Sequence, residues 1–365
     1  MTPLLDLERE LDALRVEGLL RAPTLASDTS LLVLCGNDYL GYAREPLPPS
    51  THPAGAGASR LVSGDHPEHR DAERALATWL GQDDALLFSS GYAANVGVLS
   101  AIAGPGDVIV SDALNHASII DGCRLSRAEV AVVPHGEADA FAAALAAHRR
   151  ARRRWLVTES YFSMDGDSPD LARLRAIADE HQAGLVVDEA HALGVLGPEG
   201  RGACAAAGVA PDIFIGTLGK ALGLAGAFVA GPQVLRSYLW NRARSFVFST
   251  GVSPVIAAAV AERVARCRAD DAGRERLASL GRELRATFPE GSLGASHGPI
   301  LPWIIGDEEE ALAHGRALAQ AGILVVPIRP PTVPRGTSRL RITLHAKLSD
   351  DELRLAAEAF AARRC

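Results

Sequence analysis

Between Asp71 and Ala230, short apolar runs alternate with longer segments of helical composition, and no other feature constrains the fold as strongly. The expected strands are 85–88, 108–110, 130–133, 155–158, 185–187, 213–215 and 227–230, with helices expected over 72–80, 94–103, 116–127, 138–148 and 171–181. Strands that are apolar throughout are typical of parallel sheets covered by helices on both faces. The pattern therefore predicts an α/β fold with a mostly parallel central sheet flanked by helices.

Different patterns flank this region. Leucines at helical spacing predict an amphipathic helix over 4–20, followed by an extended segment over 31–34. After Pro254, long helices (255–268, 274–286, 308–320) alternate with strands (301–305, 323–326, 340–342). A chain of 365 residues is long for one core. We therefore expect an N-terminal helix and arm over 1–45, a large domain over 46–253 and a smaller C-terminal α+β domain over 254–365.

Composition excludes several classes of protein. Hydrophobic residues make up 48% and charged residues 22% of the chain, and no apolar run is long enough to predict a membrane span. The acidic N-terminus is unlike a secretory signal, so a cytoplasmic enzyme is expected. The net charge of −7 disfavours nucleic-acid binding, and the basic run Arg149–Arg154 is interpreted as a solvated helix end. Five cysteines without a CxxC pair indicate neither a disulfide framework nor a zinc site.

Polar residues follow four of the expected strands, at the edge where such sheets bind ligands. After 85–88, Ser89-Ser90-Gly91-Tyr92-Ala93-Ala94-Asn95 runs into a helix start. A helix start suits an anion, although this segment could equally be a connection that binds nothing. After 155–158, the segment 159–167 offers hydroxyls and acids, but it lacks the closing Glu of a calcium loop, so no metal is expected.

Asp188 and Lys220 follow two further strands. An acid at the end of a buried strand is costly unless it meets a cation or donors, so Asp188 is either functional or a structural aspartate that caps a turn or forms a salt bridge. Lys220 lies among glycines and apolar residues, which suits Schiff-base chemistry, although it could also be a lysine at a loop edge. An anion-binding helix start, an acid and an isolated lysine together suit pyridoxal 5′-phosphate.

These motifs resemble the α-oxoamine synthases, a family of fold-type-I pyridoxal-phosphate transferases. The resemblance runs through 37–41, 59–64, 90–95, 115–118, 162–167, 188–191 and 217–220. The run Arg329-Pro330-Pro331-Thr332-Val333-Pro334, followed by Arg339-Leu340-Arg341, is most similar to the members that make 8-amino-7-oxononanoate for biotin. One departure is Ala192, which stands where the family usually has glycine after the histidine of its Asp-x-Ala-His motif.

The resemblance implies a role for each matching residue. Lys220 would bind the cofactor covalently and act as general base and acid, Asp188 would pair with the pyridinium nitrogen, and His116 would stack on the ring. Without the resemblance, His116 and His191 could instead each cap a helix start or donate to a backbone carbonyl. The remaining cofactor contacts would come from Gly91, Tyr92, Ser163, His191, Thr217, Ser249 and Thr250. Substrate contacts would come from Asn37, Thr332, Arg341 and an N-terminal arginine, which is Arg21 or, if the alignment slides, Arg15.

The implied reaction is an acyl transfer in which L-alanine condenses with a pimeloyl thioester of coenzyme A or a carrier protein, yielding 8-amino-7-oxononanoate, the thiol and carbon dioxide. The alternatives are a sibling enzyme that uses glycine (2-amino-3-ketobutyrate CoA ligase or 5-aminolevulinate synthase) and a catalytically silent scaffold of the same fold. The resemblance also implies a homodimer with shared sites, in which Ser249 and Thr250 reach the neighbouring subunit's cofactor. Alternatively, these hydroxyls cap the helix that begins near Pro254.

Overall fold

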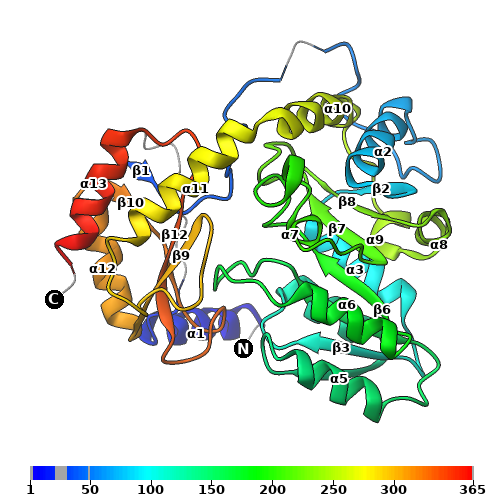
Figure 1. Ribbon diagram of the computed structural model, residues 1–365, viewed down its shortest axis with the longest axis horizontal. Helices are drawn as coiled ribbons and strands as arrows, with labels where there is room; N and C mark the ends of the chain where they lie inside the picture. Colours follow the sequence, from blue (N-terminus) through cyan, green and yellow to red (C-terminus); the bar gives the residue numbers. More distant parts are fainter. Residues whose placement is uncertain (1–2, 21–30, 48–49, 364–365) are drawn as a thin grey trace. The chain divides into compact units, whose positions relative to one another are not determined.

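The alternating segments form a seven-stranded sheet in the computed structural model, which describes residues 3–20, 31–47 and 50–363 (Figure 1). The strand order is β2 (Asp84–Phe88), β8 (Ala227–Gly231), β7 (Ile213–Thr217), β6 (Gly184–Asp188), β5 (Arg154–Glu159), β3 (Val108–Asp112) and β4 (Glu129–Val133). Pairing is parallel from β7 through β4, whereas β8 runs antiparallel to both of its neighbours. The predicted mostly parallel sheet is confirmed.

Helices cover this sheet because its strands are apolar on both faces. In β6, the successive residues Leu185, Val186 and Val187 are all fully buried, although their side chains point alternately to opposite faces. The accompanying helices are α2 (Pro67–Leu80), α3 (Gly91–Ile102), α4 (Ala117–Ser126), α5 (Ala138–Ala147), α6 (Leu171–Glu180), α7 (Ala203–Ala206), α8 (Gln233–Arg242), α9 (Arg244–Val247) and α10 (Pro254–Ala269), with a short 3₁₀ turn at Pro198–Gly200.

The chain divides into two compact units. The larger contains residues 37–163 and 167–276 and holds the seven-stranded sheet. The smaller contains the described residues of 1–36, the loop 164–166 and the described residues from 277 onward. Apart from the loop 164–166, the chain passes from one unit to the other at 36/37 and at 276/277. The domain boundaries expected from the sequence are 45/46 and 253/254, and they stay a prediction.

The smaller unit contains two small sheets. Strands β1 (Leu32–Val33) and β10 (Ile323–Leu324) pair in parallel, and β11 (Pro327–Ile328), β12 (Ser338–Thr343) and β9 (Ile300–Gly306) form an antiparallel sheet. Its helices are α1 (Pro3–Val16), α12 (Glu308–Gln320), α13 (Asp350–Ala361) and most of α11 (Asp271–Arg285). Helix α1 is shorter than expected because Gly18 takes a left-handed conformation with φ of 67° soon after its end.

The sheet direction brings the chemistry-bearing residues to one edge. Strands β2, β3, β5, β6 and β7 all point the same way, because the antiparallel β8 separates β2 from β7. The segments that follow them therefore emerge together at the carboxyl edge of the sheet. Among the described residues, no helix is both long and apolar enough to cross a membrane.

Candidate active site

The N-terminus of α3 opens toward free space at this edge. Ser90 caps the helix by accepting a hydrogen bond from the N–H of Ala93 at 3.1 Å. A Cβ built on Gly91 would meet no atom within 4 Å, so the first turn has room above it for a ligand. Tyr92 is 49% exposed, and its hydroxyl donates to Asp121 at 2.5 Å. This geometry suits the anion-binding role expected of the segment.

Asp188 ends β6 with its carboxylate held by protein donors. It is 8% exposed and accepts hydrogen bonds from Nδ2 of Asn95 at 2.7 Å and from the N–H of Ala190 at 2.8 Å. Asn95 is buried on α3, and its Nδ2 also lies 3.0 Å from Oγ of Ser118. Through the N–H of Ala190, Asp188 caps the turn that follows β6, as the capping alternative expects, and its functional role stays a prediction.

His116 caps α4 after β3. Its N–H donates to Glu159 at 2.7 Å, and its Nδ1 accepts from the N–H of Ser118 at 3.2 Å. Although the side chain is exposed, desolvation by the surrounding protein lowers the pKa of His116; Lys220 lowers it further and Asp188 opposes this. The imidazole is therefore neutral at pH 7, which suits stacking on a ring rather than pairing with an anion.

Glu159 lies beside these groups at the end of β5. It is directly opposite Asp188 in the β5–β6 register and is 3% exposed. Burial, reinforced by the charge of Asp188 and opposed by that of Lys220, raises the pKa of Glu159 to about 8. A carboxyl group with this pKa holds its proton for much of the time at neutral pH. Sequence reasoning assigned Glu159 no role.

Lys220 lies in the turn that follows β7. It is half-buried, and its charge acts on both His116 and Glu159, which places the amine within electrostatic reach of this cluster. Thr217 at the end of β7 donates through Oγ1 to the carbonyl of Gly226 at 3.2 Å and accepts from the N–H of Gly219 at 3.2 Å. Thr217 thus shapes the turn that carries Lys220.

His191 and Asn37 are linked through Tyr39. The Tyr39 hydroxyl lies 2.6 Å from Nδ1 of His191 and 3.4 Å from Oδ1 of Asn37. His191 is 6% exposed and lies three residues after Asp188. The neighbouring Ala192 is fully buried, so the departure from the family pattern is accommodated without exposing the turn. Tyr39 is the residue that sequence reasoning missed here.

Ser163 and the pair Ser249 and Thr250 lie on connecting segments of the larger unit. Ser163 is 8% exposed and follows Phe162, whose N–H donates to the carbonyl of Asp167 at 2.9 Å. Ser249 is half-buried and Thr250 is exposed. Neither caps α10, whose N-cap is Ser253, so the helix-capping alternative for the two hydroxyls is wrong.

Arg341 and Thr332 belong to the smaller unit. Arg341 is 5% exposed on the central strand β12 and pairs across the sheet with Pro302. Its charge also acts on Cys35, opposing the increase that burial causes in the pKa of that thiol. Thr332 is exposed and follows the Arg329–Pro331 segment. The substrate-binding roles expected of Arg341 and Thr332 stay a prediction.

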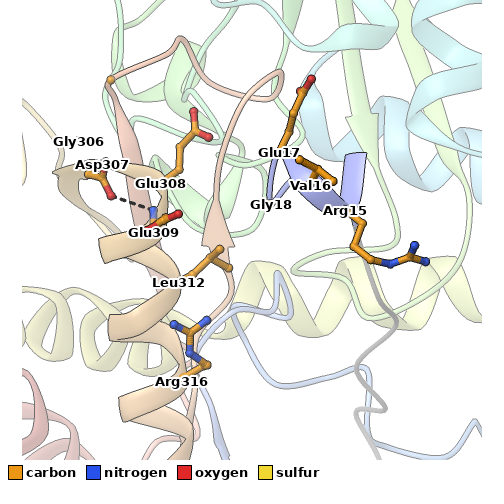
Figure 2. A pocket seen from close by; sticks show the side chains of 11 residues that line it. Arg15, Val16, Glu17, Gly18, Gly306, Asp307, Glu308, Glu309, Leu312 and Arg316 are labelled. Carbon is orange, nitrogen blue, oxygen red and sulfur yellow. Dashed lines mark hydrogen bonds between the residues drawn. The ribbon is translucent and has the colours of Figure 1, made fainter. Parts of the chain in front are cut away.

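Of the two candidates for the N-terminal substrate arginine, Arg21 lies outside the described residues, whereas Arg15 lines a pocket of about 770 Å³ in the smaller unit. Figure 2 shows Arg15, Val16 and Glu17 at the end of α1, together with Leu312 and Arg316 of α12. Arg316 and acidic residues of 307–309 line the same pocket, and the guanidinium of Arg15 pairs with Asp12 on α1. The role of an N-terminal arginine in binding substrate stays a prediction.

These residues fit pyridoxal 5′-phosphate. Open space over Gly91 at a helix start suits a phosphate, a buried carboxylate at Asp188 suits a protonated ring nitrogen, and the amine of Lys220 lies in the same cluster. No group of three or more His, Cys, Asp or Glu side chains in the described parts of the chain could hold a metal ion.

Comparison with known proteins agrees with this geometry. Residues 29–360 match the family model of the class I and II aminotransferases. A curated 8-amino-7-oxononanoate synthase from Anaeromyxobacter sp. (strain Fw109-5) is 53% identical, covering 94% of this chain and 92% of its own. Another from Alkalilimnicola ehrlichii is 44% identical over 93% of each chain.

Solved structures show the same fold. Serine palmitoyltransferase from S. paucimobilis, with bound PLP–myriocin, aligns with a TM-score of 0.88 at 27% identity over 98% of this chain and 96% of its own. The 8-amino-7-oxononanoate synthase of Francisella tularensis aligns at 0.75 and 26% identity, over 92% and 98%. Because both identities are low, the 53% relative decides between these two activities. The chain therefore belongs to the class I and II aminotransferase family and, within it, to the 8-amino-7-oxononanoate synthases.

Proposed function

We propose that this chain condenses L-alanine with a pimeloyl thioester to give 8-amino-7-oxononanoate, the free thiol and carbon dioxide, in biotin synthesis. The observation that carries the proposal is 53% identity over 94% of the chain to a relative of that name. The cluster of Asp188, His116 and Lys220 supports it, because these groups are the ones a pyridoxal-phosphate acyltransferase needs. The cytoplasmic location expected from the sequence stays a prediction.

This chain uses pyridoxal 5′-phosphate, which supplies an electron-withdrawing ring that stabilises negative charge on an amino acid's α-carbon. Lys220 holds the cofactor between turnovers and moves the α-proton of alanine with its Nζ. Asp188 keeps a proton on the ring nitrogen. Asn95 orients the carboxylate of Asp188 by donating a 2.7 Å hydrogen bond to it. Gly91 and Tyr92, with Ser163, His191 and Thr217, complete the binding site within the same unit.

The α-carbon of alanine gives up its proton to Lys220 and bonds to the thioester carbonyl carbon, while the thiolate leaves and is protonated. The carboxyl group of alanine then departs as carbon dioxide, and the α-carbon takes a proton in its place. Arg341 holds the alanine carboxylate through its planar guanidinium before that loss. His116, neutral because its pKa is lowered, orients the reacting groups without adding charge. Asn37 and Thr332 are further residues that we expect to contact substrate.

The working unit is a homodimer whose two sites are shared, each taking Ser249 and Thr250 from the neighbouring subunit. Two observations support this: neither hydroxyl caps α10, and Thr250 is exposed on the surface of the chain. A two-fold axis makes the exchange reciprocal.

The test is to incubate the holoenzyme with alanine or glycine and with pimeloyl-, acetyl- or succinyl-CoA in every combination, and to identify products by mass spectrometry. The proposal expects product from alanine with pimeloyl-CoA at a kcat/KM well above the other pairs. Preference for glycine with acetyl- or succinyl-CoA would instead establish one of the sibling activities. Absence of any product, in protein that carries the cofactor, would support the silent scaffold.

A further inference from the structure

The segment from Val247 to Ser253, here called the 247–253 segment, carries two hydroxyls that no contact within one chain explains. Within the described part of the chain, the side chains of Ser249 and Thr250 have no hydrogen-bond partner. Phe248 between them and α9 is 71% exposed. The backbone of this segment, by contrast, is bonded at several points, so its hydroxyls are displayed from a fixed support.

Part of that support comes from residues 58–59. Oγ of Ser59 donates to the carbonyl of Val247 at 2.8 Å, and the N–H of Gly251 donates to the carbonyl of Ala58 at 3.0 Å. The approach is close, since a Cβ built on Gly251 would lie 3.0 Å from Cγ of Arg60. Both ends of the segment are therefore tied to the same loop before α2.

His69 on α2 provides the most buried of these ties. Its Nε2 donates to the carbonyl of Val252 at 2.7 Å, and its Nδ1 accepts from the N–H of His66 at 3.1 Å. The ring is fully buried, and burial lowers the pKa of His69, which keeps the imidazole neutral. The two hydrogen bonds define a single tautomer of the ring, with the proton on Nε2 and none on Nδ1. The ring therefore holds Val252 in place relative to α2.

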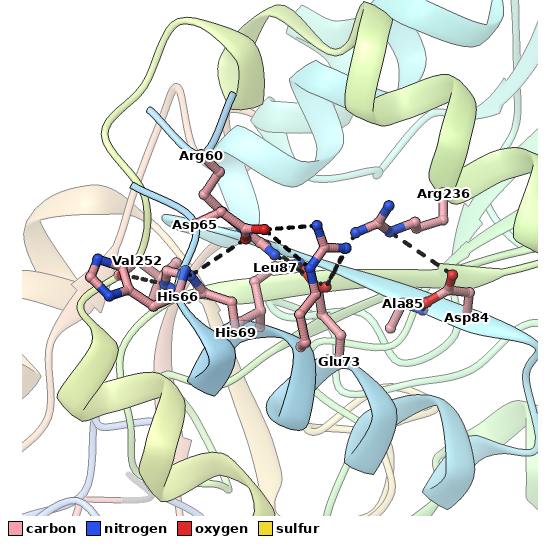
Figure 3. A network of polar contacts seen from close by, with 11 residues as sticks. Arg60, Asp65, His66, His69, Glu73, Asp84, Ala85, Leu87, Arg236 and Val252 are labelled. Carbon is pink, nitrogen blue, oxygen red and sulfur yellow. Dashed lines mark hydrogen bonds and ion pairs between the residues drawn. The ribbon is translucent and has the colours of Figure 1, made fainter. Parts of the chain in front are cut away.

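A buried ion pair lies behind this tie, as Figure 3 shows. Arg60 is 4% exposed, and Glu73 is 2% exposed; they form a two-pronged pair whose Nη2–Oε2 distance is 3.2 Å. Nε of Arg60 also donates to Asp65 at 2.8 Å, and Glu73 accepts from the N–H of Leu87 at 2.9 Å. Because desolvation offsets much of what a buried pair contributes to stability, stability alone does not explain it. The pair also joins the loop before α2 to strand β2.

We propose that His69, supported by the Arg60–Glu73 pair, is a positioning residue that fixes Ser249 and Thr250 for the cofactor phosphate of a second copy of this chain. The inference rests on the shared-site dimer of the proposed function. It predicts that a lesion at His69 damages the partner's site and leaves the site that contains the chain's own Lys220 intact.

The experiment compares His69→Leu, which removes both hydrogen bonds, with His69→Gln, which retains a side-chain amide donor. His181→Leu, at the C-cap of α6, is the matched control. Each apoprotein is titrated with pyridoxal 5′-phosphate, and binding is followed by tryptophan fluorescence. The dissociation constant should rise about tenfold in His69→Leu, because the one hydrogen bond by which His69 holds the 247–253 segment, to the carbonyl of Val252, is lost. His69→Gln and His181→Leu should stay close to the unchanged chain. An unchanged constant in folded His69→Leu would overturn the inference.

Subunit mixing then separates positioning from general damage. His69→Leu is mixed with Lys220→Ala under conditions that exchange subunits, and in parallel Ser249→Ala/Thr250→Ala is mixed with Lys220→Ala. If His69 acts on the partner's site, one site of each mixed dimer contains neither lesion, so activity rises above that of either parent in both mixtures. Recovery only in the hydroxyl mixture would overturn the role of His69, whereas recovery in neither would overturn the shared site itself. If His69→Leu does not fold, His69→Asn, whose shorter amide cannot reach the carbonyl of Val252, takes its place with the same expected outcomes.

Discussion

His135 provides a charge whose contribution to stability can be followed by pH. Its Nδ1 lies 3.0 Å from the carboxylate of Asp112, its Nε2 lies 3.1 Å from that of Asp167, and its ring meets Phe162 edge-on at 4.4 Å between centroids. This clamp, formed by His135 between Asp112 and Asp167, joins the end of β3 to the loop that carries Ser163. Burial opposes the charge, but hydrogen bonds and attraction from Asp112 and Asp167 outweigh it and raise the pKa of His135 from 6.5 to about 10.

The contribution of charged His135 to the free energy of unfolding follows from the difference between its pKa in the folded and the unfolded chain. A shift of about 3.5 pKa units corresponds to about 5 kcal/mol if it is fully expressed. The side chain is 24% exposed, and screening by solvent reduces this to about 1–3 kcal/mol. Because the pKa is raised in the folded chain, this stabilisation is complete below pH 6.5 and is lost as the pH rises through about 10.

The assay is urea unfolding of the unchanged chain and His135→Gln between pH 6 and pH 10.5. Glutamine keeps hydrogen-bonding capacity but carries no charge, so the difference in unfolding free energy should be about 1–3 kcal/mol at pH 6 and shrink toward zero above pH 10. His181→Gln, whose ring makes no ion pair in the described part of the chain, should show no such dependence. A difference that stays constant across this range, or grows with pH, would refute the charged clamp.

Three further outcomes are expected. Asp188→Asn should leave the cofactor bound but reduce kcat at least tenfold, because an amide cannot hold the ring nitrogen protonated; steady-state kinetics and cofactor absorbance check this. Arg341→Lys should raise the KM for alanine about tenfold, since the planar fork is lost, and an unchanged KM would move the carboxylate site elsewhere. Of Arg15→Gln and Arg21→Gln, the variant that raises the KM for pimeloyl-CoA identifies the N-terminal substrate arginine, and an effect in neither would remove both.

The sequence alone predicted the elements whose signal is local. Short apolar runs located every strand of the central sheet, and the residues after them, Asp188 and Lys220 among them, emerge at one edge as expected. The strand order and the reversed direction of β8 were not predicted, because pairing depends on partners far apart in the sequence. The same holds for Glu159, whose significance arises from lying opposite Asp188 in the β5–β6 register.

Long-range polar contacts were missed for a related reason. Asn95 lies 93 positions from Asp188, Tyr39 lies 152 from His191, and only folding reveals that they are bonded. His135 had no distinguishing pattern, since its two carboxylate partners come from separate segments. The N-terminal helix was predicted from its leucine spacing, yet Leu4 is 71% exposed in the single chain, so the pattern indicated the helix but not what covers it.

The most direct test of the account follows the carbon atoms of alanine. The holoenzyme is supplied with pimeloyl-CoA and L-alanine labelled with ¹³C either at the carboxyl carbon or at the α-carbon, and product and gas are analysed by mass spectrometry. We expect 8-amino-7-oxononanoate that retains the α-carbon label, with all of the carboxyl label in carbon dioxide, and no product from Lys220→Ala. A product that keeps the carboxyl carbon, or equal turnover by Lys220→Ala, would contradict it.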